Sequence, residues 1–168
     1  MAEYTLPHSA SGERQRLALM SELLDPMERG LIERLGLRAG WRCLEVGCGN
    51  GSVSRWLAEQ VFPAGHVVAS DLDISYLADL ESPCLEVRQL DVLHGSMENA
   101  AYDFVVARAL LHHLPSAKQA LERMVAALKP GQYRVKWAVV CVDTHHAEGS
   151  YSFTVAGNGA GNGAGNGG

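Results

Sequence analysis

The chain has 168 residues, of which 47% are hydrophobic and 20% are charged, so one globular domain is expected and intrinsic disorder is excluded. The net charge of −5 argues against a nucleic-acid backbone as the main partner, because such binders usually carry a basic surface. No run of about 18 apolar residues is present, and the first residues lack the apolar stretch of a secretory signal. We therefore expect a cytoplasmic protein with no membrane span. The cysteines form no C-x-x-C pair, which favours reduced thiols at Cys43, Cys48, Cys84 and Cys141.

The first part of the chain, residues 1–40, has the pattern of a helical lead-in. Apolar residues recur at helical spacing over 11–36. Asp25 suits an N-cap, and Pro26 suits the first turn of a helix. The sequence therefore predicts two consecutive helices that meet at this point.

From residue 41 onward, short apolar runs alternate with amphipathic segments. Because parallel strands need crossover connections, this alternation predicts an α/β fold with a doubly wound, mostly parallel sheet over residues 41–142. The expected strands are 41–46, 66–70, 85–90, 102–107 and 133–142, and the expected helices are 52–62, 73–80 and 116–128. The last part, 143–168, is atypical and ends in a repeat of Gly, Asn and Ala that we expect to be flexible.

A glycine-rich loop follows the first predicted strand, in the run Glu45-Val46-Gly47-Cys48-Gly49-Asn50-Gly51. Glycine lets a backbone turn sharply and approach a ligand, and the helix that follows offers unpaired N–H groups. A tight turn without a ligand is one alternative. A dinucleotide site is another, but Ser52 stands where the G-x-G-x-x-G pattern requires its last glycine.

Acidic residues end the next two predicted strands, at the sheet edge where open α/β folds bind ligands. Asp71 could accept hydrogen bonds from both ribose hydroxyls, while Asp73 fits a cap of the next helix. Asp91 could accept a hydrogen bond from an adenine amine, with Val92 and Leu93 covering the ring. A solvated loop acid is the alternative for Asp91.

Basic residues follow the fourth predicted strand, in the run ARALLHHLP (107–115). Arg108 and His112 are expected near the reacting group. The adjacent histidines lack a third ligand at metal-binding spacing, so we expect no metal. Either His112 or His113 could act as a base, because histidine titrates near neutral pH, although loop packing or capping would also explain them.

Taken together, the motifs LEVGCGNG, ASDLD, LDVL and YDFVVARALLHHLP resemble class I S-adenosylmethionine-dependent methyltransferases with a Rossmann-like fold, in the style of bacterial small-molecule methyltransferases. The match covers roughly residues 13–131. The resemblance implies S-adenosylmethionine as the cofactor and a small-molecule acceptor. A membrane partner is not expected, and the net charge makes a nucleic-acid partner an unfavoured expectation. The cofactor-binding residues that it implies are Glu45, Gly47, Cys48, Gly49, Gly51, Asp71, Leu72, Asp91, Val92 and Arg108, with His112 as the candidate catalytic base.

The resemblance ends after Gly131, where the family usually continues with a second glycine, a fifth strand and further elements. Here Gln132 follows, and no sixth or seventh strand is apparent. The sheet is therefore expected to lack its usual last strands. Two other functions stay open: a fragment that binds the cofactor without catalysis, and a nicotinamide-dependent oxidoreductase.

Overall fold

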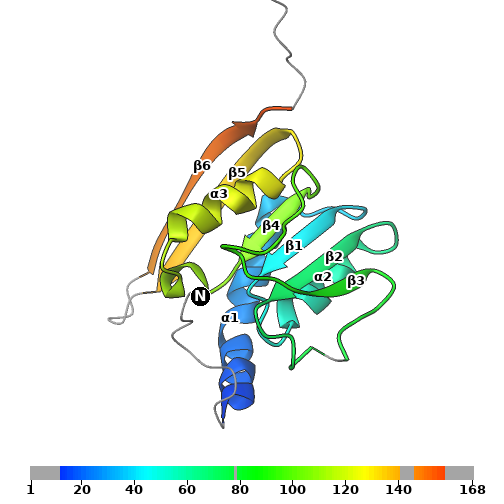
Figure 1. The fold of residues 1–168 in the computed structure, drawn as a ribbon, viewed down its shortest axis with the longest axis vertical. Coiled ribbons are helices and arrows are strands. Elements are labelled where there is room, and N and C mark those ends of the chain that lie inside the picture. The colour runs from blue at the N-terminus through cyan, green and yellow to red at the C-terminus, as the bar shows by residue number, and fades with distance from the viewer. Residues whose placement is uncertain (1–11, 78, 141–145, 158–168) are drawn as a thin grey trace, which may run out of the picture.

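The computed structural model describes residues 12–77, 79–140 and 146–157. Its centre is a four-stranded parallel sheet in the order β3-β2-β1-β4 (Figure 1). The strands are β1 (Arg42–Val46), β2 (His66–Asp71), β3 (Leu85–Gln89) and β4 (Phe104–Ala107). This confirms the Rossmann-like, mostly parallel α/β fold that the sequence predicts.

Helices cover both faces of the parallel sheet (Figure 1). Helices α1 (Glu13–Leu35) and α2 (Ser52–Val61) contribute to the core on one face, and α3 (Ala117–Ala127) contributes to the core on the other. Because β1 and β2 are buried on both faces, their sequences are nearly continuous apolar runs. A short 3₁₀ helix, η1 (Leu111–His113), lies between β4 and α3.

The strand register aligns the carboxyl ends of the inner strands. Val46 of β1 is opposite Ser70 of β2 and opposite Ala107 of β4. The loops after β1, β2 and β4 therefore leave the sheet at the same edge, where ligands bind in open α/β sheets.

The prediction of two helices meeting at Pro26 is wrong, because α1 runs unbroken from Glu13 to Leu35. Proline removes one backbone donor from a helix, but it does not have to end the helix when neighbouring contacts hold it. Asp25 is accordingly no N-cap. Its carboxylate accepts hydrogen bonds from Arg29 and from Arg108.

The predicted helix over 73–80 is also wrong, since the described residues of this segment form turns. The carboxylate of Asp73 accepts a hydrogen bond from the N–H of Ser75 at 2.9 Å, which stabilises a turn rather than a helix start. Leu77 and Leu80 are buried in the core, and this accounts for the apolar spacing that suggested a helix.

After α3 the chain forms a separate antiparallel ribbon of β5 (Gly131–Val140) and β6 (His146–Val155). The strand predicted at 133–142 therefore exists in part, but it does not join the parallel sheet. The expectation of no further strand fails at β6. Cross-strand packing explains the pairing, because the rings of Tyr133 and Phe153 stack at 5.8 Å and Trp137 covers Gly149.

Some sequence predictions fall outside the described residues, namely Cys141 and the glycine-rich end from residue 158. Within the described ranges, no helix has the length and apolar character needed to cross a membrane.

Candidate cofactor site

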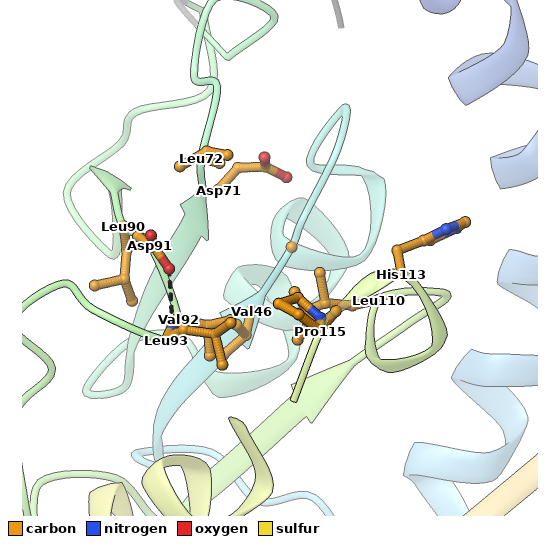
Figure 2. A pocket seen from close by; sticks show the side chains of 12 residues that line it. Val46, Asp71, Leu72, Leu90, Asp91, Val92, Leu93, Leu110, His113 and Pro115 are labelled. Carbon is orange, nitrogen blue, oxygen red and sulfur yellow. Dashed lines mark hydrogen bonds between the residues drawn. The ribbon is translucent and has the colours of Figure 1, made fainter. Parts of the chain in front are cut away.

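A pocket opens at the carboxyl edge of the parallel sheet, between the loops that follow its four strands (Figure 2). It contains about 520 Å³ of space, its open mouth included. Apolar side chains form most of its wall, with two carboxylates and one imidazole among them. The lining residues are Val46, Gly47, Asp71, Leu72, Leu90, Asp91, Val92, Leu93, Leu110, His113, Leu114 and Pro115.

The glycine loop forms the inner end of the pocket. Gly47 and Gly49 have φ angles of 72° and 59°, in the left-handed region that favours glycine. A Cβ atom on Gly47 would lie 3.0 Å from the side chain of Leu110, so a larger residue would push this wall outward. The N–H groups of Gly47 and Cys48 donate to the carbonyl of Ser70, which ties the loop to the end of β2.

Asp71 ends β2, and only 6% of its surface is exposed. Its carboxylate accepts hydrogen bonds from the N–H of Gly49 at 2.8 Å and from the N–H of Asp73 at 3.2 Å. The carboxylate is also part of the pocket lining, and carboxylate oxygens are acceptors for hydroxyl groups. The side chain lies above the glycine loop (Figure 2). The hydrogen bond from Gly49 therefore fixes the position of the loop relative to the end of β2.

Asp91 lies just beyond β3, next to the apolar part of the pocket. One of its oxygens accepts hydrogen bonds from the N–H of Leu93 at 2.8 Å and from the N–H of His94 at 3.3 Å (Figure 2). These bonds fold residues 91–94 into a turn, which brings Val92 and Leu93 into the wall. Apolar walls with a few fixed polar groups are the usual composition of small-molecule sites.

The structure brings only part of the predicted set to the pocket. Five of the predicted cofactor residues line it, and they are Gly47, Asp71, Leu72, Asp91 and Val92. The others are not among its lining residues, and they are Glu45, Cys48, Gly49, Gly51 and Arg108. Cys48, Gly49 and Gly51 belong to the same loop as Gly47 but do not line the pocket. Glu45 and Arg108 make contacts elsewhere.

Glu45 lies on the face of β1 that packs against α1 and α2. Alternation along the strand sends Leu44 and Val46 to the opposite face, so Glu45 and the pocket are separated by the sheet. The hydroxyl of Ser54 in α2 donates to its carboxylate. Burial raises the pKa of Glu45 to about 8, so the side chain is mostly protonated at neutral pH.

Arg108 follows β4 and binds acidic residues of α1. Its guanidinium donates to Asp25 at 2.5 Å and lies 3.1 Å from a carboxylate oxygen of Glu28. Hydrogen bonds and ion pairs to these acids raise the pKa of Arg108, against the opposing effect of burial. Sequence reasoning could not find these contacts, because Asp25 and Arg108 are 83 positions apart.

Of the two histidines, His113 lines the pocket and His112 does not. Figure 2 places His113 on the opposite side of the pocket from Asp91. Burial lowers the pKa of His113, and nearby His112 and Arg16 add to this effect, which favours the neutral imidazole. In the described part of the chain, no group of three potential metal ligands occurs.

The sequence reasoning did not single out several apolar wall residues, which are Leu90, Leu110, Leu114 and Pro115. All of them lie within motifs that it did identify, Leu90 in LDVL at the end of β3 and the others in the run after β4. Their position close to the end of a strand is the only feature of the sequence that could have indicated a place in the pocket wall. The sequence pattern alone is equally consistent with core residues at these positions, and Leu90 and Leu110 are indeed both buried.

The residues present fit S-adenosylmethionine, the cofactor that the resemblance implies. Gly47 lines the pocket with backbone alone, so a polar ligand can approach the loop closely at this position. Asp71 places a carboxylate, an acceptor for hydroxyl groups, in the lining, and Leu72, Val92 and Leu93 provide an apolar surface for a purine ring. No lining residue places a cationic side chain against the positive sulfonium.

Comparisons with known proteins agree with this fit. A family model for a methyltransferase domain matches residues 43–131, just over half of the chain. A demethylmenaquinone methyltransferase of Oceanobacillus iheyensis is 31% identical over 120 residues, covering 67% of this chain and 48% of that protein. An uncharacterized methyltransferase of Mycobacterium tuberculosis is 34% identical over 97 residues, covering 55% and 48% respectively. The chain thus spans about half the length of these relatives.

Solved structures show the same fold. An S-adenosylmethionine-dependent methyltransferase from Aquifex aeolicus aligns with a TM-score of 0.58 at 22% identity, covering 71% of both chains. Another from Mesorhizobium loti aligns with a TM-score of 0.56 at 17% identity, covering 75% of this chain and 63% of that one. The nicotinamide alternative finds no support in these comparisons. With the family model spanning the glycine loop, both carboxylates and the histidine segment, the chain belongs to the S-adenosylmethionine-dependent methyltransferase family.

Proposed function

We propose that this chain transfers a methyl group from S-adenosylmethionine to a small-molecule acceptor. The observation that carries the proposal is the shared pocket of Gly47, Asp71 and Asp91 at the carboxyl edge of the sheet. The name of the Oceanobacillus iheyensis relative supports a small acceptor, because that protein is a demethylmenaquinone methyltransferase. Free thiols at Cys43, Cys48 and Cys84 support a cytoplasmic location.

In this proposal the chain supplies alignment rather than chemical activation. Bound S-adenosylmethionine supplies a methyl carbon that its positive sulfur already activates. Asp71 orients the ribose, the apolar wall orients the adenine, and the glycine loop fixes the methionine end by its backbone. Holding both reactants in attack geometry can provide about 7–11 kcal/mol of the barrier reduction. No contribution from Glu45 is required, because its carboxyl is buried behind the loop.

His113 is the proposed base for an acceptor that loses a proton. It lines the pocket, and its lowered pKa leaves the imidazole ready to accept a proton at pH 7. The acceptor atom would form its bond to the methyl carbon as the carbon–sulfur bond breaks toward sulfur, and the acceptor proton would pass to His113. His112, the base that the sequence favoured, does not line the pocket.

The test is transfer of an isotope-labelled methyl group from S-adenosylmethionine to a panel of phenols, reduced quinones, amines and thiols. Label in an organic acceptor, with equal S-adenosylhomocysteine release, supports the enzyme. Binding of S-adenosylhomocysteine without transfer to any acceptor would instead support a cofactor-binding fragment. For an active acceptor, His113→Gln should lower kcat at least tenfold, whereas the matched variant His112→Gln should change it less than twofold.

A further inference from the structure

The contacts of Arg108 form a small buried network behind the cofactor pocket. Besides its bonds to Asp25 and Glu28, the guanidinium lies 3.4 Å from the hydroxyl of Ser52, the first residue of α2. The Ser52 hydroxyl in turn donates to Asp25 at 3.1 Å. The side chains of Arg108 and Asp25 are only 17% and 11% exposed, so water screens their attraction weakly. Three elements, α1, α2 and the segment after β4, therefore meet at one ion pair.

On one side, this network holds the glycine loop. Asn50 of the loop accepts a hydrogen bond from Ser21 of α1 at 3.1 Å and from the N–H of Ser52 at 3.2 Å. Leu17, one helical turn before Ser21, packs over Gly49, since a Cβ there would lie 3.1 Å from its side chain. Leu17, Ser21 and Asp25 are spaced by four residues and so share one face of α1. Leu17 and Ser21 on this face contact the loop, and Asp25 contacts the first residue of α2.

On the other side, the network holds a strained turn. Ala109, next to Arg108, has a φ angle of 48°, which is uncommon for a residue other than glycine and costs energy unless its surroundings impose it. Directly after it, Leu110 packs against Gly47 and begins the wall that continues through His113 and Leu114. Arg108 on one side of the strained residue and Leu110 on the other fix the direction in which this wall leaves the sheet.

We propose that Arg108 and Asp25 are a positioning pair whose ion pair sets the glycine loop and the 110–115 wall at the separation that the cofactor needs. The sequence predicts that Arg108 touches the cofactor. In this proposal it acts instead through the geometry of the pocket. The inference rests on the proposed cofactor site. Two observations carry it independently of each other: the bridge from Asp25 to the first residue of α2, and the strained backbone beside Arg108.

The experiment is a double-mutant cycle on S-adenosylhomocysteine affinity, measured by calorimetry well below the melting temperature. Its members are the wild type, Asp25→Asn, Arg108→Gln and the double variant, each checked for folding by circular dichroism. A positioning pair predicts that each single variant weakens binding at least fivefold. It also predicts that the double variant binds within twofold of the weaker single one, because either change breaks the same pair.

Two further variants keep the outcomes separate. Should Arg108→Gln fail to fold, Arg108→Lys replaces it, since lysine keeps the charge but lacks the fork that reaches both Asp25 and Ser52. Arg29→Gln is the matched control, because Arg29 also binds Asp25, at 2.9 Å, but is 38% exposed and lies over the ring of Trp56 in α2 rather than on the loop. The Arg29→Gln variant should bind S-adenosylhomocysteine with the affinity of the wild type.

Two results would overturn the inference: wild-type affinity in Asp25→Asn, or single effects that multiply in the double variant, as expected for direct contact by Arg108. A change in melting temperature without a change in affinity would equally contradict it, since that is the signature of a purely structural pair. If the wild type itself does not bind S-adenosylhomocysteine, it is the proposed function that fails.

Discussion

Asp71 is the residue on which the pocket depends most, because it combines two tasks in one carboxylate. It accepts a hydrogen bond from the N–H of Gly49 at 2.8 Å, and it lines the pocket at the proposed ribose site. We predict that Asp71→Ala weakens S-adenosylhomocysteine binding by about 1.5–3 kcal/mol, the range for hydrogen bonds to a charged group. Calorimetry measures this directly. The matched variant Asp73→Ala removes a nearby acid that does not line the pocket and should change binding by less than twofold. If Asp71→Ala binds S-adenosylhomocysteine as tightly as Asp73→Ala does, Asp71 is not a ligand of the cofactor.

Glu45 gives a second prediction at the residue scale, because its buried carboxyl titrates far from its ordinary value of 4.5. Between pH 4.5 and about 8, the folded protein keeps a proton that the unfolded chain has released. The free energy of unfolding therefore falls as pH rises through this window, by up to about 1.4 kcal/mol per pH unit. Glu28 on α1 and Arg108 after β4 face Glu45, and the pKa of Glu28 is raised in the same sense by burial.

The variant Glu45→Gln should flatten this slope, since the amide can still accept the Ser54 hydrogen bond but does not titrate. Denaturant unfolding at pH 5, 6, 7 and 8 measures it. Glu59→Gln, an exposed change on α2, is the control and should retain the wild-type slope. A slope that is unchanged in Glu45→Gln would show that Glu45 is ionised at neutral pH.

The residue scale also shows what a single sequence can supply. Gly47, Asp71 and Asp91 could be predicted because each directly follows a parallel strand, and such strands end at one sheet edge. Glu45 and Arg108 could not be placed, because their surroundings depend on which face of the sheet α1 covers and on a partner 83 positions away. The choice between His112 and His113 likewise depends on the 3₁₀ turn at 111–113.

At the scale of elements, the pairing of β5 with β6 in a separate ribbon is the feature that the sequence did not predict. Alternating apolar residues indicate a strand, but they do not say which strand will be its partner. The stacked Tyr133–Phe153 pair favours pairing within the ribbon. The chain therefore keeps β4 as an edge of the four-stranded sheet in the described residues. Helix α1 differs from its prediction for a similar reason, because contacts of Asp25 outside the helix outweigh the local preference for a break at Pro26.

If the ribbon and the pocket are separate units, a change in one should leave the other intact. Trp137 lies directly over Gly149, where a Cβ would come within 2.4 Å of the ring. We predict that Gly149→Val displaces Trp137 and lowers the melting temperature, while S-adenosylhomocysteine affinity stays within twofold of the wild type. Tryptophan fluorescence and calorimetry measure the two effects. A fivefold loss of affinity would show that the ribbon supports the cofactor site.

At the scale of the whole molecule, the chain contains the elements that build a cofactor pocket in about half the length of its relatives. Four parallel strands, two helices on one face and one on the other suffice to align the glycine loop with Asp71 and Asp91. Fewer of the described residues are proposed to contact the methyl acceptor than the cofactor. They belong chiefly to the 110–115 wall, which includes His113. Cofactor binding is therefore the property that the described residues support most directly.

That prediction is tested most directly by thermal unfolding of the intact chain during titration with S-adenosylhomocysteine. A ligand at 100 times its Kd that binds only the folded state stabilises it by about 2.7 kcal/mol, which for a chain of this size is a rise in Tm of roughly 5–10 °C. We predict a rise of this size that saturates with concentration and shrinks in Asp71→Ala, with no rise for NAD. A Tm that stays constant with S-adenosylhomocysteine, or that rises with NAD instead, would contradict the account.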